Sequence, residues 1–160
     1  MIIHPIPPVW NGESKILILG SFPSVKSRET SFFYGHQQNR FWRVVSAVTN
    51  SPLPVTVDEK KSYLLSSGIA LWDVIASCDI TGSSDSSIKN VTPNDLSAIL
   101  EGADIRAIFT NGKAAHSLYQ KYTKPITARE DICLPSTSPA NAAWSLEKLV
   151  VAWGVTKKYI

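Results

Sequence analysis

The stretch Lys15-Ile16-Leu17-Ile18-Leu19-Gly20 is a continuous apolar run that ends at a glycine. A half-exposed strand alternates apolar and polar residues, whereas a continuous run predicts a strand buried on both faces, as in a parallel sheet. The pattern recurs at Ile105–Thr110, just before Asn111-Gly112, and in shorter form at Asp131–Leu134. Ile69–Leu71 is a fourth candidate strand and the shortest.

Helical patterns lie between these strands. Apolar residues recur every three or four positions in Arg40–Val48, which is typical of a helix with one buried face. The pattern of Val57–Ser67 ends before Gly68, a residue that commonly follows a helix end. The other expected helices are one that Thr92 caps with Pro93 at its first position, Lys113–Tyr122 and Asn141–Trp153.

Strands that alternate with helices predict an α/β fold. We expect a three-layer α/β/α sandwich with a mainly parallel, about four-stranded central sheet, formed by residues 1–160 as a single domain. Right-handed crossovers bring the carboxyl ends of parallel strands to one edge of the sheet. Ligands of such folds usually bind at that edge, in the loops that follow the strands.

The composition excludes several classes of protein. The chain has 16 basic and 13 acidic residues, and its net charge of +3 permits a polyanionic partner without requiring one. We expect no membrane span, because no apolar run is long enough to cross a bilayer. We expect no secretory signal, because no basic segment precedes an apolar run at the N-terminus. Two distant cysteines and three isolated histidines predict no disulfide framework, metal or cofactor.

The loops expected at the functional edge are residues 20–39, 111–113 and 135–141. Gly20-Ser21-Phe22-Pro23-Ser24 either lets backbone approach a ligand closely or simply forms a tight turn, and it lacks the spacing of a phosphate loop. Leu134–Asn141 places hydroxyls and an amide at an expected helix start, where they bind an anion or cap the helix.

The segment Thr30–Trp42 holds five of the fifteen aromatic residues of the chain, interleaved with amides, His36 and Arg40. Rings beside polar groups suit a planar base, which is stacked on the rings and read along its polar edge. The alternative is that the rings belong to the core, and for Phe41 and Trp42 this alternative is favoured.

Together these segments resemble the uracil-DNA glycosylase superfamily. In that family a short G-x-x-P motif follows the first strand, and a Ser-Pro-containing motif after the last strand inserts at the minor groove of DNA. Gly20–Ser24 resembles the first motif and Ser136-Thr137-Ser138-Pro139-Ala140-Asn141 the second. With Tyr34–Trp42 between them, the chain is most similar to the hypoxanthine-DNA glycosylases, also called DNA-deoxyinosine glycosylases. The likeness also includes Pro8–Asn11, Leu71–Val74 and Asp85–Ile88.

The resemblance implies a monofunctional DNA glycosylase of base excision repair. Such an enzyme flips a deaminated base out of DNA, holds it in a pocket and hydrolyses its N-glycosidic bond, leaving an abasic site. It needs no metal, cofactor or covalent nucleophile, because the transition state resembles a sugar cation and catalysis is electrostatic and positional. The implied partner is DNA that contains a deaminated base, and we expect a monomer in the cytoplasm of a bacterial or archaeal cell.

The resemblance also assigns roles to residues. Asn39 is the implied catalytic residue, which would orient water and support the base or the developing charge by hydrogen bonds. The expected base pocket consists of Gly20, Ser21, Phe22, Tyr34, His36 and Asn111. The expected DNA contacts are Ser136, Ser138, Pro139, Ala140 and Asn141, with Lys26, Arg28, Arg40 and Lys113 as phosphate contacts.

Two departures from the family bear on the substrate. The uracil enzymes place Asp or Asn at the third position of the first motif, where this chain has Phe22. The enzymes most active on uracil begin the second motif with His, where this chain has Ser136. Both departures favour a deaminated purine, hypoxanthine. The alternatives are a uracil or mismatch-specific enzyme of the same family, a non-catalytic nucleic-acid or nucleotide-binding module, and a small α/β hydrolase that uses Ser21, Ser24 or Ser138.

Overall fold

The computed structural model describes residues 1–160, and its central sheet has four parallel strands in the order β3-β2-β6-β7. This confirms the predicted α/β fold and its central sheet. The strands lie at or near their predicted positions: β2 is Ile16–Gly20, β3 is Ile69–Asp73, β6 is Ala107–Asn111 and β7 is Asp131–Leu134.

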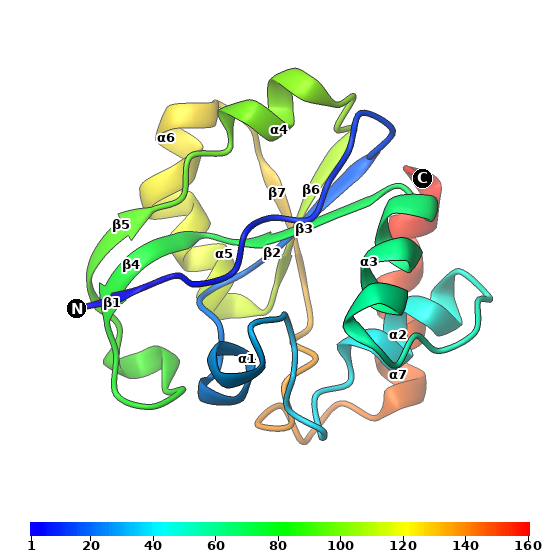
Figure 1. Ribbon diagram of the computed structural model, residues 1–160, viewed down its shortest axis with the longest axis horizontal. Helices are drawn as coiled ribbons and strands as arrows, with labels where there is room; N and C mark the ends of the chain where they lie inside the picture. Colours follow the sequence, from blue (N-terminus) through cyan, green and yellow to red (C-terminus); the bar gives the residue numbers. More distant parts are fainter.

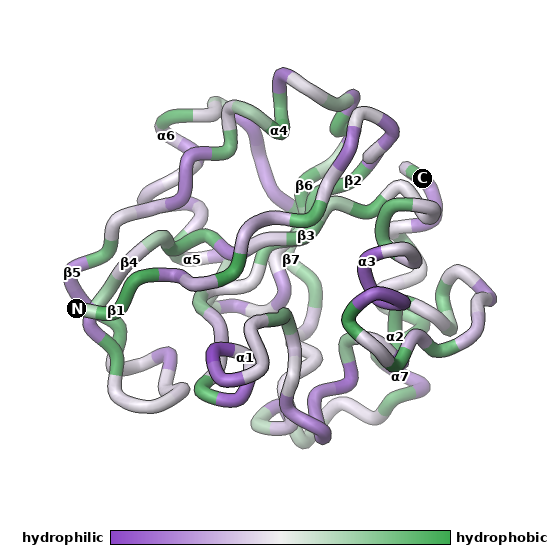
Figure 2. The backbone as a smooth tube through the Cα atoms, viewed as in Figure 1, coloured by the Kyte–Doolittle hydropathy of each residue, from purple (hydrophilic) through white to green (hydrophobic).

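Strand β2 lies between two hydrophobic cores. Ile16 and Ile18 pack in one cluster with helices α2 (Phe41–Val48), α3 (Val57–Ser66) and α7 (Leu146–Trp153). Leu17 and Leu19 pack in the other cluster, on the opposite face of the sheet. All four side chains are fully buried, which is why the run contains no polar residue. Figure 2 colours the backbone by the hydropathy of each residue.

The structure also contains a second sheet, which the sequence did not predict. It is antiparallel, in the order β1-β4-β5, with β1 at Ile2–Ile3, β4 at Ile75–Asp79 and β5 at Lys89–Pro93. Only one residue separates β3 from β4, so the chain passes from the parallel sheet into the second sheet just after Asp73. The Asn94 side chain fixes this junction, because its Nδ2 donates to the carbonyls of Asp73 and Ile75.

The predicted helix start at Thr92 and Pro93 is wrong. Both residues belong to β5, an edge strand, where a proline is tolerated because its missing N–H can face away from the neighbouring strand. The helix that follows, α4, covers Ser97–Gly102.

Three other helical regions differ from the prediction. The last helix begins at Leu146, capped by Ser145, and not near Asn141. The helix expected from Lys113 is divided into α5 (Lys113–Leu118), a π-helical turn and α6 (Lys124–Thr127). Within the first loop, Ser24 caps a short helix, α1 (Val25–Thr30), that was not predicted. No helix is long and apolar enough to cross a membrane.

The parallel strands all end at one edge of the central sheet. In Figure 1 this edge is in the lower half of the view, where α1, the segment before α2 and the segment between β7 and α7 lie together. Segments far apart in the sequence therefore meet there, as the parallel topology predicts.

Candidate active site

A cavity of about 420 Å³ opens at this edge of the sheet. All three predicted loops contribute to it, together with the end of β3 and the segment at residues 83–85. The predicted site residues that line it are Gly20, Ser21, Phe22, Tyr34, His36, Asn39, Asn111, Ser136, Ser138, Pro139 and Ala140. Those outside its lining are Asn141, Lys26, Arg28, Arg40 and Lys113.

Two donors orient the side chain of Asn39. Its Oδ1 accepts from the backbone N–H of Phe41 at 2.9 Å and from the hydroxyl of Thr137 at 2.9 Å. Because a backbone N–H can only donate, the atom it meets is the amide oxygen, and the amide nitrogen is left without a partner in the protein. Asn39 therefore offers the cavity a hydrogen-bond donor, while its oxygen is already occupied.

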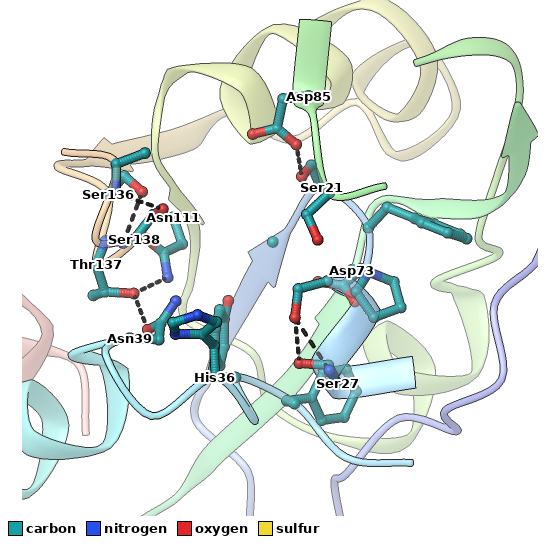
Figure 3. Close-up of a pocket in the computed structure, with 18 of the residues that line it drawn as sticks. Ser21, Ser27, His36, Asn39, Asp73, Asp85, Asn111, Ser136, Thr137 and Ser138 are labelled. Atoms are coloured by element: carbon teal, nitrogen blue, oxygen red, sulfur yellow. Dashed lines mark hydrogen bonds between the residues drawn. The ribbon is translucent and has the colours of Figure 1, made fainter. Parts of the chain in front are cut away.

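Thr137 connects the Asn39 loop to the end of β6 (Figure 3). Its fully buried hydroxyl accepts from Asn111 Nδ2 at 3.0 Å, and its backbone N–H donates to Asn111 Oδ1 at 3.0 Å. Asn111 thus holds Thr137, and Thr137 holds Asn39. Both ends of the Asn111 amide are engaged, so this residue supports the catalytic candidate more than it can read a base or bind a phosphate.

Arg40 holds the loop that follows β7. Its guanidinium donates to the backbone carbonyls of Thr137, Ser138, Asn141 and Trp144. Its backbone N–H donates to the Thr137 carbonyl at 3.1 Å. The prediction that Arg40 contacts a phosphate is therefore wrong, because the protein itself uses most of the donors of this side chain.

A buried carboxylate lies beside the first motif. Gly20 and Asp73 are register partners on β2 and β3. A Cβ atom on residue 20 would lie 2.4 Å from Asp73 Oδ1 and 3.0 Å from the hydroxyl oxygen of Tyr34, so only glycine leaves room for both groups. The glycine predicted to permit close approach of a ligand thus also admits two polar groups of the protein to the cavity floor.

His4 anchors this carboxylate. Its Nε2 lies 2.8 Å from Asp73 Oδ2, and its Nδ1 accepts from the backbone N–H of Ile6 at 3.1 Å. Because Nδ1 acts as an acceptor, the ring proton lies on Nε2 and is donated to Asp73. The two side chains are only 3% and 5% exposed, so water competes little for this contact.

Tyr34 lies against the same floor in a left-handed backbone conformation, with φ of 53°. Its ring stacks on Phe41 with centroids 4.2 Å apart, and its hydroxyl is buried without a hydrogen-bond partner. Burial, together with the negative charges of Asp73 and Asp85, raises the pKa of the Tyr34 hydroxyl. The phenol therefore stays protonated and keeps a proton to donate.

A second carboxylate lies at the rim of the cavity. Ser21 donates from its hydroxyl to Asp85 Oδ1 at 2.8 Å. Loss of water around the carboxyl raises the pKa of Asp85, and the nearby charge of Asp73 acts in the same direction, although the Ser21 hydrogen bond opposes them. Two carboxylates thus flank the turn that begins at Gly20.

The aromatic residues are mostly core residues. Phe32 is 4% exposed, stacks on Trp42 and does not line the cavity, so the prediction that this segment provides a stacking surface is wrong for Phe32. Phe33 lines the cavity but is only 2% exposed. Phe22 lines the cavity, but the residue is only 8% exposed, and its ring meets His4 edge-on with centroids 5.7 Å apart. Phe22 therefore shields His4 and offers little ring surface to a base.

The second motif forms a loop and not a helix start. Backbone N–H groups of Ser138 and Ala140 donate to the hydroxyls of Ser136 and Ser138, and Asn141 Nδ2 donates to the Ser136 carbonyl. The expectation that a helix N-terminus binds an anion here is wrong, because α7 begins several residues later. Pro139 and Ala140 form the exposed tip of the loop.

The three other basic candidates differ in exposure. Lys26 and Lys113 are exposed beside the cavity loops. Arg28 is half-buried, donates to the Gly82 carbonyl and lies over the Phe22 ring at 5.7 Å, so it holds the rim of the site.

Asp73, Asp85, Thr137 and His4 were not among the predicted site residues. Asp73 follows the predicted strand Ile69–Leu71 by two positions, and a longer strand would have placed its carboxylate at the functional edge. Thr137 stands inside the second motif, but only the structure reveals its contacts with Asn39 and Asn111. The sequence contains no signal for the pairing of His4 with Asp73.

A parallel sheet with its cavity between the first-strand loop and the last-strand loop is the arrangement of a class of base-excising enzymes. The family model described as Uracil DNA glycosylase superfamily matches residues 7–155. The chain therefore belongs to the uracil DNA glycosylase superfamily, which confirms the resemblance seen in the sequence.

Two curated relatives carry a more specific name. A protein from Methanosarcina acetivorans named hypoxanthine DNA glycosylase is 36% identical over 147 residues, covering 91% of this chain and 92% of the relative. A protein of the same name from Methanosarcina barkeri is 32% identical over 109 residues, covering 67% of this chain and 69% of the relative.

A solved structure has the same fold. The solution NMR structure of a protein from Methanosarcina acetivorans, described as a candidate uracil DNA glycosylase, matches with a TM-score of 0.79 and 30% identity. The match covers 98% of this chain and 99% of that protein.

Proposed function

We propose that the protein is a monofunctional DNA glycosylase that removes hypoxanthine from DNA in base excision repair. It flips the deaminated nucleotide into the cavity and hydrolyses the N-glycosidic bond, leaving an abasic site. The observation that carries this proposal is the free amide nitrogen of Asn39, which Phe41 and Thr137 hold toward the cavity. The names of the two curated relatives support hypoxanthine as the base.

The free donor of Asn39 suits the chemistry of the leaving base. When the bond between C1′ and the base nitrogen breaks, its electron pair remains on the base, so a donor aimed at the base stabilises the developing negative charge. An amide is too weak a base to deprotonate water. With Oδ1 occupied, the amide nitrogen remains for catalysis, and we assign Asn39 to the departing base and not to the water.

The second motif is the proposed contact with DNA. Its exposed tip, Pro139 and Ala140, enters the duplex beside the flipped nucleotide, and Ser136, Ser138 and Asn141 bind the backbone. Lys26 and Lys113 remain as phosphate contacts. We expect the protein to act as a monomer in the cell interior. It would contact few phosphates in this way, which agrees with a net charge of only +3.

Purified protein, with chelator and without added metal, is expected to produce alkali-labile sites in duplexes that contain inosine opposite thymine. Matched duplexes with uracil or xanthine establish base preference, and slower uracil excision is expected because Phe22 and Ser136 replace the polar groups of the uracil enzymes. Binding of inosine-containing DNA without any cleavage would instead favour the non-catalytic module.

Changing Thr137 to Val is expected to slow excision about 10- to 100-fold, because the substitution leaves Asn39 Oδ1 without its second donor and Asn111 Nδ2 without an acceptor. Thr137→Ser is the matched control, since it keeps the hydroxyl and should stay within a few-fold of wild type. Single-turnover excision of hypoxanthine measures both. Equal rates for the Val and Ser variants would show that the hydroxyl does not position Asn39.

A further inference from the structure

We propose that Asp73 is a second catalytic residue, which stabilises the positively charged sugar and holds the attacking water, and that His4 is its positioning residue. This inference rests on the proposed glycosylase function. The uracil enzymes carry an acid or an amide at the third position of the first motif, where this chain has Phe22. The inference gives the role of a catalytic carboxylate to Asp73, at the end of β3.

One carboxylate oxygen of Asp73 is anchored and the other is free. Oδ2 accepts from His4, whereas Oδ1 makes no hydrogen bond within the protein and lies at the cavity floor beside Gly20. Asn94 holds the Asp73 carbonyl, which fixes the backbone from which the side chain projects. A carboxylate oxygen that faces a cavity and has no donor from the protein can accept a hydrogen bond or attract a cation.

The free donor and the free acceptor of the cavity lie on opposite sides of it: Asn39 Nδ2 is the free donor, and Asp73 Oδ1 is the free acceptor. Figure 3 shows Asn39, Asn111 and Thr137 on one side and Ser21, Asp73 and Asp85 on the other. Cleavage of a glycosidic bond separates charge in the same sense, because the base gains electron density while the sugar loses it. Asn39 then faces the base, and Asp73 faces the sugar, as carboxylates do in enzymes that pass through sugar cations.

The proposed step balances without any further reactant. The C1′–N9 bond breaks, and its electron pair stays on hypoxanthine, beside Asn39. A water oxygen bonds to C1′, and its proton moves to Asp73 Oδ1 and then to solvent. Hypoxanthine takes up one proton from solvent, so the products are the free base and an abasic deoxyribose.

Asp85 is a poorer candidate for this role. It lies in the exposed segment at the rim, and its Oδ1 already accepts the Ser21 hydroxyl. Asp73 is the more enclosed of the two carboxylates, and electrostatic stabilisation is strongest where water is excluded.

The test compares wild type with Asp73→Asn in two assays. The variant is expected to excise hypoxanthine about 100-fold more slowly in single turnover, since it keeps the shape of the side chain and loses its charge. The second assay measures binding to duplexes that carry a neutral tetrahydrofuran or a cationic pyrrolidine in place of the abasic sugar. Wild type should prefer the cationic duplex by at least about 10-fold, and Asp73→Asn should lose that preference.

Two further variants separate the possible outcomes. Asn39→Ala should lose excision and keep the preference for the cation, while Asp58→Asn, at the exposed start of α3, should change neither. If wild type does not excise hypoxanthine, the proposed function fails, whereas the preference for the cation still reports on Asp73. Excision by Asp73→Asn within about 3-fold of wild type, or an unchanged preference, overturns the inference.

Variants of His4 keep the inference testable if Asp73→Asn does not fold. His4→Ala leaves Asp73 without its anchor and should slow excision at least about 10-fold, whereas His4→Gln, which retains a donor, should recover part of the rate and of the cation preference. Circular dichroism and thermal melting establish that both variants are folded. Wild-type rates in both would show that His4 does not position the carboxylate.

Discussion

Replacing Asn39 with Ala is expected to slow single-turnover excision of hypoxanthine by about 100- to 1,000-fold, because the departing base loses its only identified donor on this wall of the cavity. The cost in stability should be about 1 to 3 kcal/mol, since the substitution removes the acceptor of the Phe41 N–H at the start of α2 and of the buried Thr137 hydroxyl. Rates at saturating enzyme and urea denaturation measure the two effects separately.

Asn39→Asp is the matched variant for this prediction. It has nearly the same size, keeps an acceptor for Phe41 and Thr137, and replaces the free donor with a negative charge. Because a carboxylate would repel the anionic base, Asn39→Asp should be at least as slow as Asn39→Ala. Excision by the Ala variant within about 5-fold of wild type would show that catalysis depends on another residue.

Replacing Arg40 with Ala is expected to lower the free energy of unfolding by about 3 kcal/mol. The side chain binds four backbone carbonyls in the loop after β7, and hydrogen bonds from a charged group are stronger than those between neutral groups. The loop would lose its anchor, and Thr137 would lose its fixed position beside Asn39. Excision should therefore fall together with stability.

Arg43→Ala is the control for Arg40, because Arg43 lies in α2, just after the N-cap position of Arg40, with its side chain exposed. Its loss should change stability by less than about 0.5 kcal/mol. The salt dependence of DNA binding provides a second criterion. If Arg40 bound a phosphate in the complex, Arg40→Ala would reduce the slope of log affinity against log salt by about one and leave stability intact. That result would restore the role predicted from the sequence.

The central sheet could be predicted because a strand buried on both faces has a distinctive composition. Ile16, Leu17, Ile18 and Leu19 contain no polar side chain, and few other environments select such a run. The second sheet has no such signal, since β4 is only partly buried and most of β5 is exposed. Thr92 and Pro93 then matched a helix start, although an edge strand accepts the same residues.

The loops of the site could be predicted, but not the contacts within them. Parallel topology alone brings Gly20, Asn39 and the second motif to one edge of the sheet. The backbone N–H of Phe41 and the hydroxyl of Thr137 together hold the amide of Asn39, and the contact with Thr137, 98 residues away, leaves no trace in local sequence. The aromatic segment shows the same limit, because a ring that stacks on a base and a ring that fills a core are the same residue type.

The hydrogen bonds between the Arg40 side chain and the loop after β7 also affect the order of folding. They join residues 97 to 104 positions apart, so most of the chain must be synthesised before they can form. Contacts of such long range form late, because the entropy of closing the intervening loop is lost before they contribute. During synthesis the first motif and α2 would therefore emerge well before the cavity exists. A ribosome-bound chain that ends before β7 would lack both Thr137 and the shape of the pocket.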